Sequence, residues 1–283
     1  MAKKEIEIVR RRFAGLLLTG LLVAGLVVAG LVVAYVKFAP SYPRHPYLSG
    51  WLLLAVMLFL TFFNLRKKVP FLRMGSAGFW LQLHVYVGLF SGALFFVHIG
   101  FSWPQGLLNQ VIAASFAIVF VTGVLGLWIS RSFPKRLTVA GFETPFERIP
   151  QVRNKLRAEA EALVLAGVDG QTSPVIAEFY TEKLGLFFTT PCNFRAHLLR
   201  SQTPQAAHRS QFDEIQRYAR KSERDMLDQL ADLVERKHLL DYQYALQYTL
   251  RVWLFAHIPL SYSLLILSVA HIIIVYSFSG SAP

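Results

Sequence analysis

The chain has 283 residues, of which 54% are hydrophobic and only 16% are charged. So few charges at this length are unusual for a soluble domain and indicate a membrane protein. The formal net charge of +12 does not indicate nucleic-acid binding, because the basic residues outside 131–251 flank apolar segments.

Four blocks contain no Asp, Glu, Lys or Arg, and they define the predicted membrane spans. They cover residues 13–36, 45–65, 74–130 and 252–283. About 20 apolar residues cross the hydrocarbon layer, so the third block holds two crossings, separated at 102–106. We therefore predict an all-α membrane protein with five transmembrane helices, at about 13–35, 48–65, 79–101, 107–130 and 252–277.

The flanking charges predict the orientation of these spans. Basic residues cluster in 1–12 and 66–73, whereas the opposite connections carry only Lys37 and Arg44. By the positive-inside tendency, the N-terminus and residues 131–251 are cytoplasmic and the C-terminus lies outside, in a bacterial inner membrane. The 13–35 segment is too long for a cleaved signal peptide and is expected to be an additional, uncleaved anchor helix.

Residues 131–251, here called the insert, have an ordinary soluble balance of 18 Lys/Arg and 15 Asp/Glu. Thr-Pro-Phe-Glu at 144–147 fits a capping box that opens a helix to about Leu165. Ser173-Pro174 and Thr203-Pro204 indicate further helix starts, and a helical pattern follows to about 250. We expect an all-helical cytoplasmic insert that is a structural or partner-docking module.

Neither a nucleotide-binding loop nor a metal-ligand cluster is recognisable in the sequence of the insert. His197, His208 and His238 stand apart in sequence, and each is expected to be solvated or locally bonded. The single cysteine, Cys192, excludes an internal disulfide and a cysteine-ligated cluster supplied by this chain alone.

Four histidines lie inside the predicted spans, where ionisable side chains are costly and usually functional. His84 and His98 lie on the third span, and His257 and His271 lie on the fifth; both separations are fourteen residues. Fourteen residues return a side chain to within about 40° of its starting face, about 21 Å further along the helix. Because the two spans cross in the same direction, we predict that His84 pairs with His257 near the cytoplasm and His98 with His271 near the outside.

The number of protein ligands at a site limits which metal it can bind, and each predicted histidine pair supplies two. Zinc generally needs three or four protein ligands, and no predicted span contains an acidic residue or a cysteine. Haem iron has four porphyrin nitrogens and needs only two axial ligands. Two stacked b-type haems therefore suit the four histidines. The small residues on the same helix faces would leave room for a flat macrocycle: Gly88, Ser91, Ser261 and Ser268.

At these four histidines the chain resembles the di-haem b-type membrane cytochromes. In the cytochrome b/b6 family, two parallel helices of a four-helix bundle each carry two histidines at about this spacing. The membrane domains of ferric reductases are similar. The resemblance implies that residues 48–130 and 252–277 form a di-haem four-helix bundle, with 13–35 as an addition.

Weaker candidates surround the bundle. Arg251 and the basic residues 66–68 could neutralise haem propionates on the inner side, as could Lys37 and Arg44 on the outer side. A quinone is a further candidate ligand, with His45, Gln82 and Asn109 as its polar contacts.

The sequence thus predicts an electron-transfer subunit of a membrane redox complex, without a catalytic residue of its own. Expected partners are other subunits, an external c-type cytochrome and a cytoplasmic flavin or iron–sulfur protein. A histidine-based proton or metal transporter subunit and a haem-free membrane anchor are the alternatives.

Overall fold

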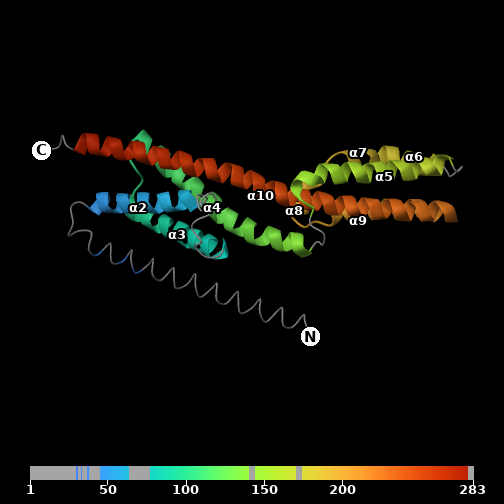
Figure 1. The fold of residues 1–283 in the computed structure, drawn as a ribbon, viewed down its shortest axis with the longest axis horizontal. Coiled ribbons are helices and arrows are strands. Elements are labelled where there is room, and N and C mark those ends of the chain that lie inside the picture. Colours follow the sequence, from blue (N-terminus) through green and yellow to red (C-terminus); the bar gives the residue numbers. More distant parts are fainter. Residues whose placement is uncertain are drawn as a thin grey trace, which may run out of the picture. The chain divides into compact units, whose positions relative to one another are not determined.

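The computed structural model describes residues 45–63, 77–139, 144–169 and 174–279, together with Gly30, Val33 and Lys37 (Figure 1). The predictions for the N-terminus, the 13–35 span and most of the 66–78 loop lie outside the described residues. Within the described ranges the regular elements are all helices and none is a strand, as expected from the sequence.

The chain divides into two compact units. One comprises residues 1–127 and 255–283, and the other comprises 128–254. The first, which we call the membrane unit, contains α2 (His45–Thr61), α3 (Ala77–His98), the first part of α4 (Leu107–Val139) and the last part of α10 (Lys221–Ser279). The second, which we call the helical unit, contains the remainder of α4 and α10 and the helices between them.

Three described helices are long and apolar enough to cross a membrane: Gly78–His98, Leu107–Thr138 and Glu223–Phe278. A shorter apolar helix covers Pro46–Thr61, within the predicted 48–65 span. Large apolar side chains point outward from these helices; Phe96, Leu125 and Ile266 are 53%, 53% and 69% exposed. Water would disfavour so much exposed apolar surface, whereas lipid would cover it, so the chain is a membrane protein.

Two helix ends differ from the predicted span ends. The helix α4 continues past Ser130 to Val139, and α10 is one helix from Lys221 to Ser279 without a break at 251. The predicted ends lie where charges begin, but a charged side chain does not terminate a helix. The break between α3 and α4 lies where it was predicted. Gly100, just after α3, and Gly106, just before α4, adopt positive φ angles of 62° and 84°, which interrupt the helix.

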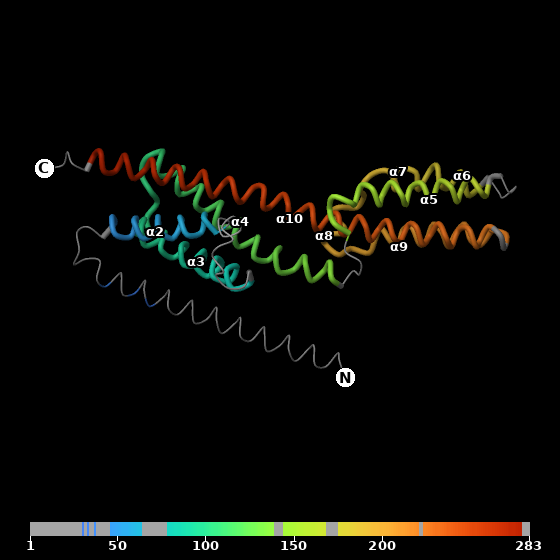
Figure 2. Tube along the Cα trace, viewed as in Figure 1, coloured from blue at the N-terminus to red at the C-terminus, as the bar shows by residue number. Residues whose placement is uncertain are grey.

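After the last part of α4, the helical unit contains a 3-10 turn, η3 (Phe146–Arg148), that leads into α5 (Ile149–Asp169). The short elements α6, η4 (a π-helical turn), α7 and α8 follow, and α9 precedes α10. Figure 2 shows α5 beside the first part of α10, and their buried residues share one core that includes Leu156, Ala160, Leu227 and Leu230. The bounds of the remaining elements are Pro174–Phe179 for α6, Tyr180–Leu184 for η4, Gly185–Thr189 for α7, Phe194–Leu198 for α8 and Thr203–Tyr218 for α9.

The predicted helix starts in the insert are partly correct. Helix α6 begins at Pro174 and α9 at Thr203, as expected. The capping box is wrong: Pro145 is the N-cap and makes no side-chain cap bond. Glu147 instead forms an ion pair with Arg251, and the amide of Thr144 donates to the side chain of Gln243 (3.0 Å). Contacts with α10 have replaced the local cap.

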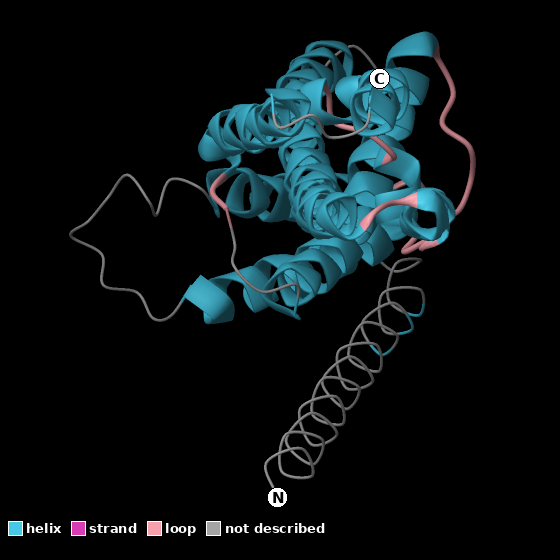
Figure 3. Ribbon diagram, turned by 90° about the vertical axis from the view of Figure 1, so that its right-hand side faces the viewer, coloured by secondary structure: helices cyan, strands magenta, loops and turns pink. Residues whose placement is uncertain are grey.

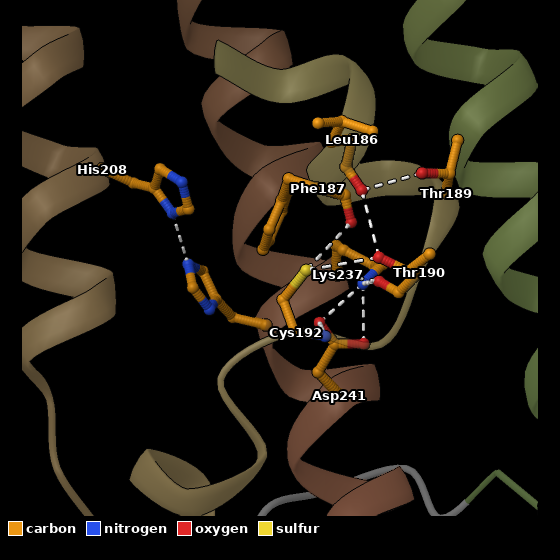
Figure 4. A network of polar contacts seen from close by, with 9 residues as sticks. Leu186, Phe187, Thr189, Thr190, Cys192, His208, Lys237 and Asp241 are labelled. Carbon is orange, nitrogen blue, oxygen red and sulfur yellow. Dashed lines mark hydrogen bonds and ion pairs between the residues drawn. The ribbon is translucent and has the colours of Figure 1, made fainter.

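An ion pair lies in the core of the helical unit (Figure 4). Lys237 Nζ contacts Asp241 Oδ2 at 2.6 Å, and the two side chains are 0% and 2% exposed. Lys237 also donates to the carbonyl of Thr190 (3.0 Å), and the amide of Cys192 donates to Asp241 (3.2 Å). Burial lowers the pKa of Lys237 and raises that of Asp241, while their mutual attraction opposes both shifts. The surrounding bonds therefore offset the cost of burying both charges.

Replacing Lys237 by methionine is expected to lower the free energy of unfolding of the helical unit by about 3–5 kcal/mol, because Asp241 would remain buried without a countercharge. Native-state hydrogen exchange on the full chain measures this loss. Lys155→Met is the matched control: Lys155 and Glu159 form the same i,i+4 pair, but their side chains are 78% and 42% exposed. The control should cost less than about 1 kcal/mol, and equal losses would contradict the account.

Candidate functional site

The four intramembrane histidines come together in two pairs within the membrane unit. His84 of α3 is close enough to His257 of α10 for their charges to interact, and so is His98 to His271. The pairs follow the sequence order on both helices, so the two segments run in the same direction. The lower-numbered pair is called the inner pair below, and His98 with His271 is called the outer pair.

The outer pair borders a cavity of about 400 Å³, within the range of small-molecule and cofactor pockets. Its walls are mostly apolar and come from α2, α3, α4 and α10. Trp51 and Tyr276 both line it, and the indole nitrogen of Trp51 donates to the Tyr276 hydroxyl (2.8 Å). The cavity therefore combines two imidazoles with a hydrophobic interior.

Helix α2 approaches His98 very closely. A Cβ atom placed on Gly50 would lie 2.9 Å from His98 Cε1, a distance that real Cβ contacts do not show. The preceding residue, Ser49, is buried, and its Oγ lies 3.2 Å from His98 Nδ1. A glycine at position 50 is thus required for this position of the His98 ring.

The inner pair has a similar neighbour on α4. Thr122 Oγ1 lies 2.9 Å from His257 Nδ1, and a Cβ on Gly123 would meet His257 Cε1 at 3.5 Å. His84 packs against the ring of Phe63, with centroids 4.8 Å apart. The Nδ1 atom of His84 is buried and has no hydrogen-bond partner among the described residues. An unsatisfied imidazole nitrogen is costly in an apolar core, so a ligand at this level would be favoured.

The region between the two levels is filled by apolar side chains. Leu264 lies seven residues from each histidine of α10 and is 3% exposed. The rings of Phe95 and Phe116 stack beside it in the same cluster, with centroids 4.2 Å apart. This packing keeps the inner and outer pairs as separate sites.

The small residues predicted on these helix faces differ in their surroundings. A Cβ on Gly88, one turn after His84, would meet no atom within 4 Å, so space remains there. The hydroxyls of Ser91, Ser261 and Ser268 donate to carbonyls of their own helices at 2.7, 2.8 and 2.9 Å. Their hydrogens are therefore used within the helix. Ser268 also lines the outer cavity.

Of the predicted propionate and quinone contacts, few are placed beside the histidines. Arg251 belongs to the helical unit, where it pairs with Glu147 and lies over the Phe146 ring at 4.2 Å. Asn109 lines the outer cavity, and Gln82 is exposed. The candidates Arg44 and 66–68, and the side chain of His45, lie outside what the structure describes.

The expectation of solvated or isolated histidines in the insert is wrong for His197 and His238, whereas a hydrogen bond to a neighbour is found for His208. His197 and His238 are each only 3% exposed, and their rings lie 6.0 Å apart. His208 Nδ1 lies 2.8 Å from His238 Nε2 (Figure 4). Packing of α8 and α9 against α10 brings together residues that are distant in sequence. In the part of the chain that the structure describes, no group of three or more His, Cys, Asp or Glu is arranged to hold a metal ion.

Burial lowers the pKa of all three of these histidines. The pKa of His238 falls to about 3, first through desolvation and then through the neighbouring charges of His208, His197 and Lys237. Desolvation also lowers the pKa of His197 and that of His208. The cluster is therefore neutral at pH 7.

The membrane unit brings two imidazoles together at each of two levels. The described helical segments around the pairs supply no carboxylate or thiolate that could complete a four-coordinate zinc site. A cofactor that brings its own equatorial ligands fits such a pair. Figure 3 shows the helices viewed from one end, with short loops as their described connections. Rigid helices thus carry all four imidazoles.

The comparisons with known proteins are negative. No protein-family model matches the sequence, and no curated protein or solved structure matches it. The ligands that the histidine pairs could bind are therefore inferred from the residues of this chain alone.

Acid is expected to destabilise the helical unit. The unfolded chain binds protons at an ordinary histidine pKa of about 6.5, whereas buried His238 binds one only near pH 3, so stability is full above about 6.5 and falls below it. One such group lowers the free energy of unfolding by up to about 1.4 kcal/mol per pH unit in this window.

Hydrogen exchange of α9 and residues 221–254 between pH 7 and pH 4, corrected for the intrinsic exchange rate, measures this slope. His238→Gln removes the titrating group and should reduce the slope. An unchanged slope in the variant would show that His238 does not carry the effect.

Proposed function

We propose that this protein is a di-haem cytochrome b subunit of a membrane redox complex. His84 and His257 would be the axial ligands of one haem b, and His98 and His271 those of the other. Each haem would exchange one electron, and the two together would relay electrons across the bilayer.

The observation that carries the proposal is the pairing of imidazoles at two levels of the apolar membrane unit. Each level offers two nitrogen ligands from two helices, which is the number that haem iron lacks. At the outer level the proposal is supported by the cavity that His98 and His271 border. At the inner level it is supported by the open space beside Gly88, one turn after His84.

The arrangement fits haem better than proton or metal transport. A proton relay through a membrane generally recruits Asp or Glu, and none occurs in the charge-free segments that hold the four histidines. Leu264, Phe95 and Phe116 form an apolar layer beside the outer pair, and the hydroxyls of Ser91 and Ser261 are bonded to carbonyls of their own helices. Electrons can cross such a layer between two haems, whereas protons need polar groups or water.

The proposed topology has five spans, with a four-helix bundle formed by residues 48–130 and 252–277. The N-terminus and the insert would be cytoplasmic in a bacterial inner membrane, as the flanking charges indicate. The inner haem would then lie near the cytoplasm and the outer haem near the opposite surface. A quinone pool or a cytoplasmic flavin or iron–sulfur protein would exchange electrons on one side, and an external acceptor such as a c-type cytochrome on the other.

Alanine variants of the four histidines test the assignment of ligands. His84→Ala and His257→Ala should each remove the same haem, and His98→Ala and His271→Ala should each remove the other, because iron would lose one of its two axial bonds. A pyridine haemochrome assay and reduced-minus-oxidised spectra of the purified full chain give the haem content. Wild-type protein that is folded but colourless would contradict the proposal, and loss of haem in crossed pairs would contradict the pairing.

Gly50→Ala is expected to remove or distort only the outer haem. The added Cβ would lie 2.9 Å from His98 Cε1, so either the imidazole or helix α2 must move. The change is measured as the loss of one haem component in the reduced spectrum. Gly78→Ala is the matched control, since a Cβ there meets no atom within 4 Å. Equal spectra for both variants would show that the contact with Gly50 is unimportant.

A further inference from the structure

One histidine of each pair is bonded through Nδ1 to a hydroxyl on a neighbouring helix. Ser49 of α2 serves His98 at 3.2 Å, and Thr122 of α4 serves His257 at 2.9 Å. A glycine follows each hydroxyl residue, at positions 50 and 123, and both glycines lie beside the same imidazoles. The bonded histidine belongs to α3 in the outer pair and to α10 in the inner pair. Each pair therefore has one histidine bonded to a hydroxyl.

The other hydrogen bond of Ser49 determines where the protons lie. Its Oγ also lies 3.1 Å from the carbonyl oxygen of Pro46, which can only accept. A serine hydroxyl has one hydrogen and two lone pairs. Both contacts are hydrogen bonds only if the hydroxyl donates to Pro46 and accepts from His98 Nδ1–H.

The same reasoning applies to Thr122. Its Oγ1 donates to the carbonyl of Val119 at 2.9 Å, one helical turn earlier. It must then accept the hydrogen of His257 Nδ1–H. In both imidazoles the proton is thereby placed on Nδ1, and the lone pair is on Nε2.

We propose that Ser49 and Thr122 are positioning residues that hold His98 and His257 in the Nδ1–H form, with Nε2 available to bind haem iron. The proposal rests on the proposed function. Metal-binding histidines commonly donate their second ring N–H to a fixed acceptor, which sets the ring orientation and makes the ligand more basic. Here the acceptors are hydroxyls held in place by their own helix.

The arrangement gives each haem a separate control. Of the four histidines, Ser49 is bonded to His98 of the outer pair, and Thr122 is bonded to His257 of the inner pair. A more basic ligand stabilises ferric iron relative to ferrous iron. Loss of one hydroxyl should therefore raise the midpoint potential of one haem and leave the other unchanged.

Ser49→Ala and Thr122→Val in the full chain test the proposal. Ser49→Ala should raise the potential of the outer haem and weaken its retention by about 10- to 100-fold, and Thr122→Val should do the same for the inner haem. Redox titration followed by optical spectroscopy gives the potentials, and transfer to apomyoglobin gives haem retention. Ser49→Thr and Thr122→Ser keep a hydroxyl and should restore both properties.

Ser277→Ala and Ser102→Ala are the matched controls, because these exposed hydroxyls also lie in the membrane unit and donate to the nearby carbonyls of Ile273 and Ile99. If Ser49→Ala and Thr122→Val match these controls in a protein with two haems, the positioning role is wrong and the proposed function stands. A wild-type protein without haem would instead overturn the proposed function. A change in both haems from either variant would contradict the separate control.

Discussion

The cost of placing an imidazole in an apolar interior is the constraint on which the site depends. Every ring nitrogen there needs a hydrogen-bond partner or a metal, since no water compensates for its loss of solvation. In the membrane unit, neighbouring hydroxyls satisfy one nitrogen of His98 and one of His257. The four histidines lie in two pairs, and haem iron is the partner that we propose for one nitrogen of each.

The helical unit meets the same cost in a different way. His208 and His238 are hydrogen-bonded to each other, and burial lowers the pKa of His238, so that it stays neutral. Its buried lysine is compensated by Asp241 and the carbonyl of Thr190. These groups use one another as partners, and no metal-binding arrangement results among the described residues. Histidines in one chain therefore have two distinct roles, one in folding and one in the proposed cofactor binding.

Much of the membrane unit could be predicted because its signals are local. Charge-free segments mark the helices that can cross a membrane, and equal spacing of histidines on two such helices predicts their pairing. The ends of α4 and α10 could not be predicted from charge, because the helices continue across Arg131 and Arg251. The cluster of His197, His208 and His238 depends on the packing of three helices, which no local pattern records.

The positioning hydroxyls had only a weak signal in the sequence. Ser-Gly at 49–50 and Thr-Gly at 122–123 lie in charge-free segments, but Ser-Gly also occurs at 91–92. There the hydroxyl bonds its own helix, and a Cβ on Gly92 would meet the ring of Phe120 instead of a histidine. Such a dipeptide can position a histidine only where a neighbouring helix places an imidazole beside it.

Near-infrared magnetic circular dichroism of the oxidised, purified full chain tests the central claim most directly, because the charge-transfer band of low-spin ferric haem depends on both axial ligands. Our account predicts two low-spin haems per chain, each with two histidine ligands. A chain with one haem, with no haem, or with a ligand other than histidine on either iron would contradict it.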